Sequence, residues 1–235
     1  RENDWDSRAH RLFDARRCGF ARPGAHRGRV EGGELPADHA PRHDFFARVE
    51  GPAVEHLERN FQERWNQLIE RGARWSRHAT AVADPPSCPP LPGGVQVQVV
   101  RTMPEPFCER GILDVHLRAL RAARRLIYIE DQYFRSTHVS DAIAATVRAF
   151  PGVHVVVVTV RSQADDLLAG GWSREAFDRI ARRLPGFRLY TLQVQGVDRA
   201  GRRHLVEVDN HAKLMLVDDL FLTVGSANIN DRAFE

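Results

Sequence analysis

An alternation of short apolar runs with amphipathic stretches over the second half of the chain constrains its fold most strongly. Runs with the length and composition of strands lie at residues 95–100, 126–134, 153–160 and 187–194. Between them, apolar side chains recur every three or four residues at 109–125 and 140–150, and Ser173 precedes a third such stretch, which ends at Leu184. Strands that alternate with helices build layered α/β domains. We therefore expect an α/β domain with a mixed or parallel sheet.

The first half of the chain is organised differently and ends at a stretch rich in proline and glycine. Residues 84–94 carry five prolines and two glycines, which neither a helix nor a central strand accepts. Upstream, residues 45–49 alternate as a short strand would, and Pro52 opens an amphipathic helix that ends at Gly72. The chain thus divides into three expected parts: residues 1–83, a linker at 84–94 and a domain at 95–235.

The composition excludes several classes of protein. The longest apolar stretch, residues 153–160, is far shorter than the roughly 20 residues of a membrane span. Three cysteines without C-x-x-C spacing indicate neither a disulfide framework nor a zinc site. His39 and His43 have the spacing of a helical metal pair, but Pro41 lies between them, so we expect no metal. A basic surface attracts an anionic membrane or nucleic acid, but a formal charge of +3 is too small to decide whether this chain binds either.

A candidate for catalysis lies near the C-terminus. His211 and Lys213 are two residues apart within an expected strand at residues 210–217. Side chains at this spacing point to the same face of a strand. An ammonium binds a non-bridging phosphate oxygen, and an imidazole attacks phosphorus or transfers a proton. The pair therefore indicates phosphodiester chemistry.

Further polar groups follow the expected strand. Asp218 and Asp219 have the chemistry of a tight hairpin turn, and a strand-like run follows them at residues 220–225. The hairpin is expected to bring the hydroxyl of Ser226 and the amide of Asn228 close to the histidine and lysine. We expect both side chains to bind the substrate phosphate.

The lysine itself is unusual in this chain. Lys213 is the only lysine among 34 Lys and Arg residues. A compact ammonium and a broad guanidinium fork are not interchangeable at a shaped site. The position of the single lysine therefore adds independent support for a role that arginine does not fill.

The pattern His211-x-Lys213-x4-Asp218-x6-Gly225-Ser226-x-Asn228 resembles the HKD signature of the phospholipase D superfamily. Residues 127–134, IYIEDQYF, are similar to a tract that lipid-cleaving phospholipases D carry between two HKD motifs. Residues 49–54 and 61–66 resemble segments that follow the first motif in that family, and residues 3–6 resemble the tail of the first motif's own region. The resemblance implies a layered α/β/α domain with a mixed sheet at 95–235, preceded by the tail of a first phospholipase D-like half.

The resemblance also exposes a difference, because the family pairs two HKD motifs and this sequence has no second H-x-K. We expect the first motif to precede Arg1 in the same polypeptide and the family pattern to continue past Glu235. The isolated chain is accordingly expected to be inactive or nearly so.

The mechanism that the resemblance implies is a two-step displacement at phosphorus without metal or cofactor. One histidine attacks to form a phosphohistidine, and the other protonates the leaving alcohol and then activates water or an acceptor alcohol. His211 takes the acid/base role, and Lys213 binds the phosphate. Asp218 completes the catalytic motif and is expected to act mainly as a structural carboxylate in the hairpin, whereas Asp6 is a candidate to orient the missing histidine.

A half-exposed strand and a substrate pocket both account for the polar residues Glu130, Gln132 and Tyr133.

The function that the resemblance implies is hydrolysis of a glycerophospholipid at a membrane surface to phosphatidic acid and a free alcohol, with exchange of the head group as a further reaction. Three alternatives stay open: cardiolipin synthesis, nucleic acid cleavage by a single-motif dimer, and a non-catalytic module that binds phosphate or a membrane. Nucleic acid is the less expected substrate, and the sequence assigns no compartment.

Overall fold

The computed structural model describes residues 42–70, 81–83, 89–90, 92–105, 107–160, 187–197 and 201–234. The chain forms two compact units, one made of Arg1–Phe46 with Thr102–Glu235 and the other of Ala47–Arg101. The expected linker at 84–94 stays a prediction. The helix expected after Ser173 and the carboxylate of Asp6 lie outside the described residues.

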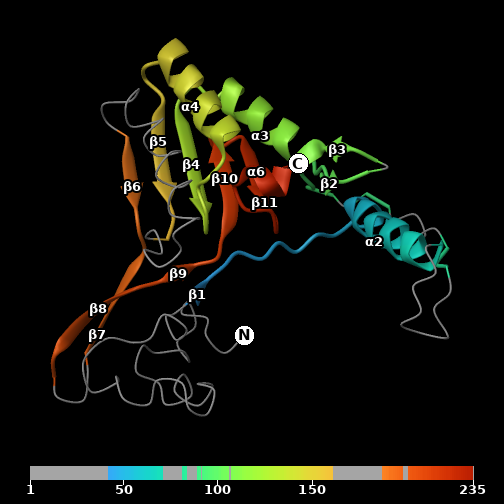
Figure 1. The fold of residues 1–235 in the computed structure, drawn as a ribbon, viewed down its shortest axis with the longest axis horizontal. Coiled ribbons are helices and arrows are strands. Elements are labelled where there is room, and N and C mark those ends of the chain that lie inside the picture. The colour runs from blue at the N-terminus through green and yellow to red at the C-terminus, as the bar shows by residue number, and fades with distance from the viewer. Residues whose placement is uncertain are drawn as a thin grey trace. The chain divides into compact units, whose positions relative to one another are not determined.

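The larger unit is built on a five-stranded sheet with the order β11-β10-β4-β5-β6 (Figure 1). Its strands are β4 (Leu126–Asp131), β5 (His154–Val158), β6 (Arg188–Tyr190), β10 (Lys213–Val217) and β11 (Phe221–Val224). Strands β4, β5 and β6 are parallel, whereas β10 runs antiparallel to both β4 and β11. The prediction of an α/β fold with a mixed sheet is confirmed.

Two helices, α3 (Gly111–Ala122) and α4 (Thr137–Ala149), pack together against one face of this sheet (Figure 1). A short helix, α6 (Asp231–Phe234), adds the buried ring of Phe234 to the same core. The largest fully buried side chains of the sheet and helices are Leu120, Ile127, Ile129, Ile143 and Met215. Helix α4 begins earlier than expected, because Ser136 caps it by accepting the N–H of Val139.

Three two-stranded pairings complete the larger unit. They join β1 (Arg42–His43) to β9 (Asp209–Asn210), β2 (Thr102–Met103) to β3 (Glu109–Arg110), and β7 (Gln193–Val197) to β8 (Arg203–Glu207). The β1–β9 pair is parallel and places His43 beside Asn210. It thereby brings the segment 42–46 to the start of β10, where the candidate site lies.

Four strand predictions are wrong in detail. The strand expected at 187–194 covers two strands, β6 and the start of β7, which belong to different sheets. Residues 45–49 form no strand, since pairing with β9 stops at His43. Residues 95–100 also form none, because no described strand pairs with them, and Val95 remains 83% exposed. The strand expected at 210–217 is interrupted, because β9 pairs with β1 whereas β10 pairs with β4.

The smaller unit contains the predicted amphipathic helix as α2 (Ala53–Glu70). Arg101 contacts this helix through the side chains of Asn60, at 3.0 Å, and Glu63. Phe61 and Trp65 stack with ring centroids 5.9 Å apart. Among the described helices, none combines the length and the apolarity that crossing a bilayer requires.

Candidate active site

The candidate site lies at the edge of the sheet where β4 ends and β10 begins. The antiparallel register places Lys213 opposite Asp131, and the N–H of Gln132 donates to the carbonyl of Ala212 at 3.1 Å. His211 precedes β10 by two residues and lies outside both neighbouring strands. Its position is fixed by its backbone N–H, which donates to the carbonyl oxygen of His43 at 2.7 Å.

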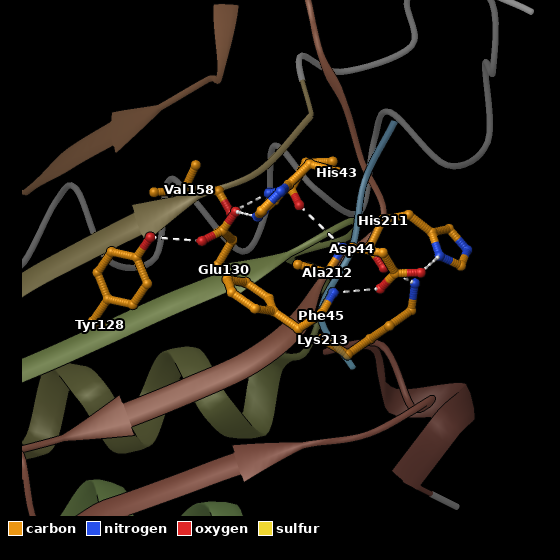
Figure 2. Close-up of polar contacts among 10 residues, drawn as sticks. His43, Asp44, Phe45, Tyr128, Glu130, Val158, His211, Ala212 and Lys213 are labelled. Carbon is orange, nitrogen blue, oxygen red and sulfur yellow. Dashed lines mark hydrogen bonds and ion pairs between the residues drawn. The ribbon is translucent and has the colours of Figure 1, made fainter. Parts of the chain in front are cut away.

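The imidazole of His211 contacts a carboxylate from the distant N-terminal segment (Figure 2). Its Nδ1 lies 2.9 Å from Oδ2 of Asp44, and the two side chains are 31% and 15% exposed. The N–H of Phe45 donates to the other carboxylate oxygen of Asp44 at 3.0 Å. This contact favours the tautomer with the proton on Nδ1, which leaves the Nε2 lone pair directed away from Asp44. A histidine held in this way is suited to proton transfer or attack.

Sequence reasoning missed both His43 and Asp44. It considered His43 only as half of a metal pair and placed the orienting carboxylate at Asp6. The available signal was a histidine–aspartate dipeptide just upstream of the family-like segment at 49–54. The contact between Asp44 and His211 spans 167 residues of sequence, and no local pattern shows such a pairing.

Lys213 is buried in spite of its charge. Its side chain shares a face of β10 with Met215 and Val217, and the residue is 7% exposed. The Nζ donates to the carbonyl oxygen of His211 at 2.6 Å, so the ammonium lies directly beneath the histidine backbone. A buried ammonium carries a large desolvation cost unless it is compensated, and the carbonyl of His211 and the carboxyl group of Asp131 both interact with this one.

Asp218 lies at the opposite end of β10 from His211, in the hairpin turn to β11. Both Asp218 and Asp219 have positive φ, at 54° and 58°, and the N–H of Leu220 closes the turn on Val217 at 3.0 Å. The Asp218 carboxylate accepts the backbone N–H groups of three consecutive residues at 2.7–2.8 Å: Arg124, Arg125 and Leu126. Desolvation alone would raise the pKa of Asp218, but these hydrogen bonds outweigh it and hold the pKa below its usual value.

The residues after β11 return to the same edge of the sheet. The N–H of Gly225 donates to the carbonyl of Lys213 at 3.1 Å, which ties the start of this segment to the lysine. Ser226 is exposed and Asn228 is half-buried. The Oδ1 of Asn228 is buried and has no hydrogen-bond partner among the described residues. A buried acceptor without a partner is uncommon and is typical of functional sites.

The three polar residues at the end of β4 have different environments. Glu130 is 3% exposed, and one of its carboxylate oxygens accepts the hydroxyl of Tyr128. Gln132 is held by its backbone, whose carbonyl accepts the hydroxyl of Thr159 at 3.1 Å. Tyr133 is half-buried, with the guanidinium of Arg135 stacked 4.2 Å from its ring centroid. Their contact with a substrate stays a prediction.

Residues 116–235, half of the chain, match the family model described as cardiolipin synthase, PLD-like domain. The chain belongs to the phospholipase D superfamily. The matched residues include His211, Lys213 and Asp218, together with the IYIEDQYF tract.

Curated relatives within this superfamily are all larger proteins. The chain is 28% identical to phospholipase D A of Dictyostelium discoideum over 82% of its own length and 17% of the relative. It is 24% identical to phospholipase D alpha 2 of Oryza sativa subsp. japonica, over 83% of this chain and 35% of the relative. Human phospholipase D1 is 24% identical, over 82% and 22% respectively. The chain thus spans between about a sixth and a third of the length of these phospholipases D.

Two solved structures of bacterial proteins resemble part of the chain. NucT from Helicobacter pylori is 20% identical with a TM-score of 0.39, over 56% of this chain and 75% of that protein. Nuc from Salmonella typhimurium, a phospholipase D family member, is 19% identical with a TM-score of 0.37, over 55% and 70% respectively.

No group of three His, Cys, Asp or Glu side chains that could hold a metal ion occurs within the described part of the chain.

Proposed function

We propose that the chain supplies one half of the active site of a lipid-cleaving phospholipase D, which hydrolyses a glycerophospholipid to phosphatidic acid and a free alcohol. The observation that carries the proposal is the pair formed by His211 and Asp44, with the buried ammonium of Lys213 under the histidine backbone. An oriented imidazole beside a fixed positive charge is the arrangement that phosphodiester cleavage requires.

In the proposed reaction, His211 acts as general acid and then as general base. A histidine of the first motif, expected outside this sequence, attacks phosphorus; the P–N bond forms, and the bond between phosphorus and the head-group oxygen breaks. The protonated His211 donates its proton to that oxygen, which leaves as the alcohol. Water, or an acceptor alcohol, then loses a proton to His211 as it attacks phosphorus, and the P–N bond breaks to release the first-motif histidine. Asp44 stabilises the imidazolium form of His211, which is present before the first step and again after the second.

Lys213 and Asn228 are proposed to bind the phosphate, with Ser226 as an exposed donor at the rim. A phosphodiester carries a negative charge that increases on its non-bridging oxygens as the nucleophile approaches. The compact ammonium of Lys213 stabilises this charge from a position that excludes water. Asn228 is proposed to bind the phosphate through the N–H groups of its side-chain amide.

The histidine and lysine of the first motif are proposed to come from an adjoining region of the same polypeptide. This chain contains one H-x-K-x4-D motif, and the phospholipases D to which it is similar are about three to six times longer than the region that it matches. This chain alone is therefore expected to bind phosphate weakly and to turn over little or no lipid.

The test is transphosphatidylation by the polypeptide encoded by the complete reading frame. Vesicles of phosphatidylcholine are incubated with the protein in the presence of ethanol, and phosphatidylethanol and phosphatidic acid are measured. The variant His211→Ala is expected to lose both products. The matched control His56→Ala removes an exposed histidine of α2 and should keep full activity. Full activity of His211→Ala would overturn the proposal.

A cardiolipin synthase-type phosphatidyl transfer is the second candidate, and the description of the matching family model favours it. The chemistry at phosphorus is the same, but the acceptor alcohol is a second phosphatidylglycerol. Vesicles of phosphatidylglycerol without ethanol distinguish the two reactions: cardiolipin without phosphatidic acid supports the synthase, and phosphatidic acid supports the hydrolase. Cleavage of DNA without turnover of either lipid would exclude both.

A further inference from the structure

Two adjacent acidic residues at the end of β4, Glu130 and Asp131, are both buried, with exposed fractions of 3% and 1%. Consecutive residues of a strand point to opposite faces of the sheet. Burying a carboxyl group costs free energy unless the group is hydrogen-bonded or paired with a charge. The contacts of the two side chains show how this cost is offset and which parts of the site each one supports.

Glu130 connects β4 to the segment that carries Asp44 (Figure 2). Its Oε2 accepts the hydroxyl of Tyr128 at 2.7 Å, and its Oε1 lies 2.9 Å from Nε2 of His43. Burial and the neighbouring Glu130 carboxylate raise the pKa of Tyr128 well above its usual value, so the phenol remains a donor. The Glu130 carboxylate therefore contacts Tyr128 through one oxygen and the His43 ring through the other.

His43 in turn determines where His211 lies. Its carbonyl accepts the backbone N–H of His211, and the next residue, Asp44, contacts the His211 ring. Strand β1 has only two residues, and so short a pairing is only marginally stable by itself. The contact between Glu130 and the His43 ring therefore stabilises the position of β1 beyond what its short backbone pairing provides.

Asp131 connects the other face of β4 to the phosphate-binding side chains. It lies opposite Lys213 in the register of β4 and β10, and its carboxyl group accepts the N–H groups of Tyr133 and Ile229. Burial raises the pKa of Asp131, although these two N–H groups and the charge of Lys213 oppose the shift. Ile229 follows Asn228 directly, and its carbonyl accepts the N–H of Arg135 at 2.8 Å.

We infer that Glu130 and Asp131 are positioning residues that serve two different parts of the site. Glu130 acts through His43 on the orientation of His211. Asp131 acts on Lys213 and, through Ile229, on Asn228. The inference deepens the proposed function and rests on it for its catalytic consequence, whereas the geometric part can be tested without any activity.

The geometric test uses two NMR signals of the chain itself. The 15N signals of the histidine ring report the tautomer of His211, and they are assigned by their absence in His211→Ala. Because Lys213 is the only lysine, a 13C label at the lysine ε-carbon gives one signal that reports its surroundings. Glu130→Gln is expected to lower the ratio of the Nδ1–H to the Nε2–H tautomer of His211 by about fivefold and to leave the lysine signal in place. Asp131→Asn is expected to shift the lysine signal and leave the tautomer unchanged.

Two exposed residues provide matched controls. Glu105→Gln and Asp219→Asn make the same chemical changes on the surface and should alter neither signal. A purely structural role for the two buried residues would make both variants disturb both signals together, and that result would overturn the inference. Two variants that leave both signals as in the controls would overturn it as well.

The catalytic consequence is measured with the complete polypeptide. Glu130→Gln is expected to lower kcat by about ten- to a hundredfold with little change in KM, since it acts on the histidine. Asp131→Asn is expected to affect kcat/KM mainly through weaker substrate binding. If the NMR signals separate as expected but no phospholipid or other phosphodiester is cleaved, the proposed function fails and the positioning roles stand. If lipid is cleaved and both variants match their controls, the positioning roles fail.

Discussion

Replacement of Asp218 by alanine removes the carboxylate that ties the β10–β11 turn to the start of β4. Three backbone N–H groups donate to this carboxylate, at 2.7, 2.8 and 2.7 Å. A net hydrogen bond contributes about 0.5–1.5 kcal/mol, so three contribute about 2–4 kcal/mol. Because the carboxylate is partly exposed, solvent weakens the interaction, and we expect a loss near the lower value, about 2 kcal/mol.

The neighbouring residue provides the control for this substitution. Asp219 also has positive φ, so alanine at either position incurs a backbone cost of about 1–2 kcal/mol. Asp219 is exposed, and none of the three N–H groups donates to it. The free energy of unfolding of Asp218→Ala should therefore fall below that of Asp219→Ala by about 2 kcal/mol, the contribution of the hydrogen bonds alone.

The difference between the two variants should depend on pH. The pKa of Asp218 is lower in the folded protein than in the unfolded chain, so the carboxylate stabilises the fold above the unfolded-state pKa of about 4. This stability is lost as the pH falls through the folded-state value. Urea unfolding followed by circular dichroism measures the free energy of unfolding of both variants at pH 7 and at pH 3. Equal losses for the two variants at pH 7 would refute the reasoning.

Three further predictions concern the site and its support. Asp44→Asn should lower kcat of the complete polypeptide by about 10²- to 10⁴-fold in the phosphatidylethanol assay, since it no longer fixes the tautomer or stabilises the imidazolium, and near-normal turnover would contradict the assignment. Lys213→Arg should lose most phosphate binding in a calorimetric titration and should destabilise the fold by about 1–3 kcal/mol, because a guanidinium is too large for a position that is 7% exposed; unchanged binding would show that charge alone suffices. Ser136→Ala should lower the free energy of unfolding by about 1–2 kcal/mol, because its hydroxyl caps α4 and donates to Asp231 at 2.5 Å, and an unchanged unfolding midpoint would argue against both contacts.

The sheet was predictable because its signals are local. The apolar runs at 126–131 and 154–158 form buried neighbouring strands, and periodic apolar residues predicted both helices that cover them. The run at 95–100 has an equally good alternation but no partner strand among the described residues. Alternation shows that a segment has an apolar face, whereas a strand also requires an edge with which to pair.

The site was predictable only where its residues share one motif. His211 and Lys213 come from the same short segment, so their spacing was visible in the sequence. Asp44 reaches His211 through a parallel pairing of two-residue strands, which leaves no pattern of its own in the sequence. The burial of Glu130 could not be predicted from the sequence either, because its partner His43 comes from the same distant segment as Asp44.

The pairing of β1 with β9 also determines when the site can form. Because Asp44 and His211 are separated by 167 residues, their contact requires closure of a very long loop, and contacts of this kind form late in folding. The sheet that holds Lys213 is stabilised by its own core and does not depend on two backbone pairs at β1. A brief local opening that releases the segment 42–46 would therefore leave a folded protein whose histidine has lost its orientation. The frequency of such openings sets the fraction of molecules that are competent at any moment, and amide hydrogen exchange at His211 reports it directly.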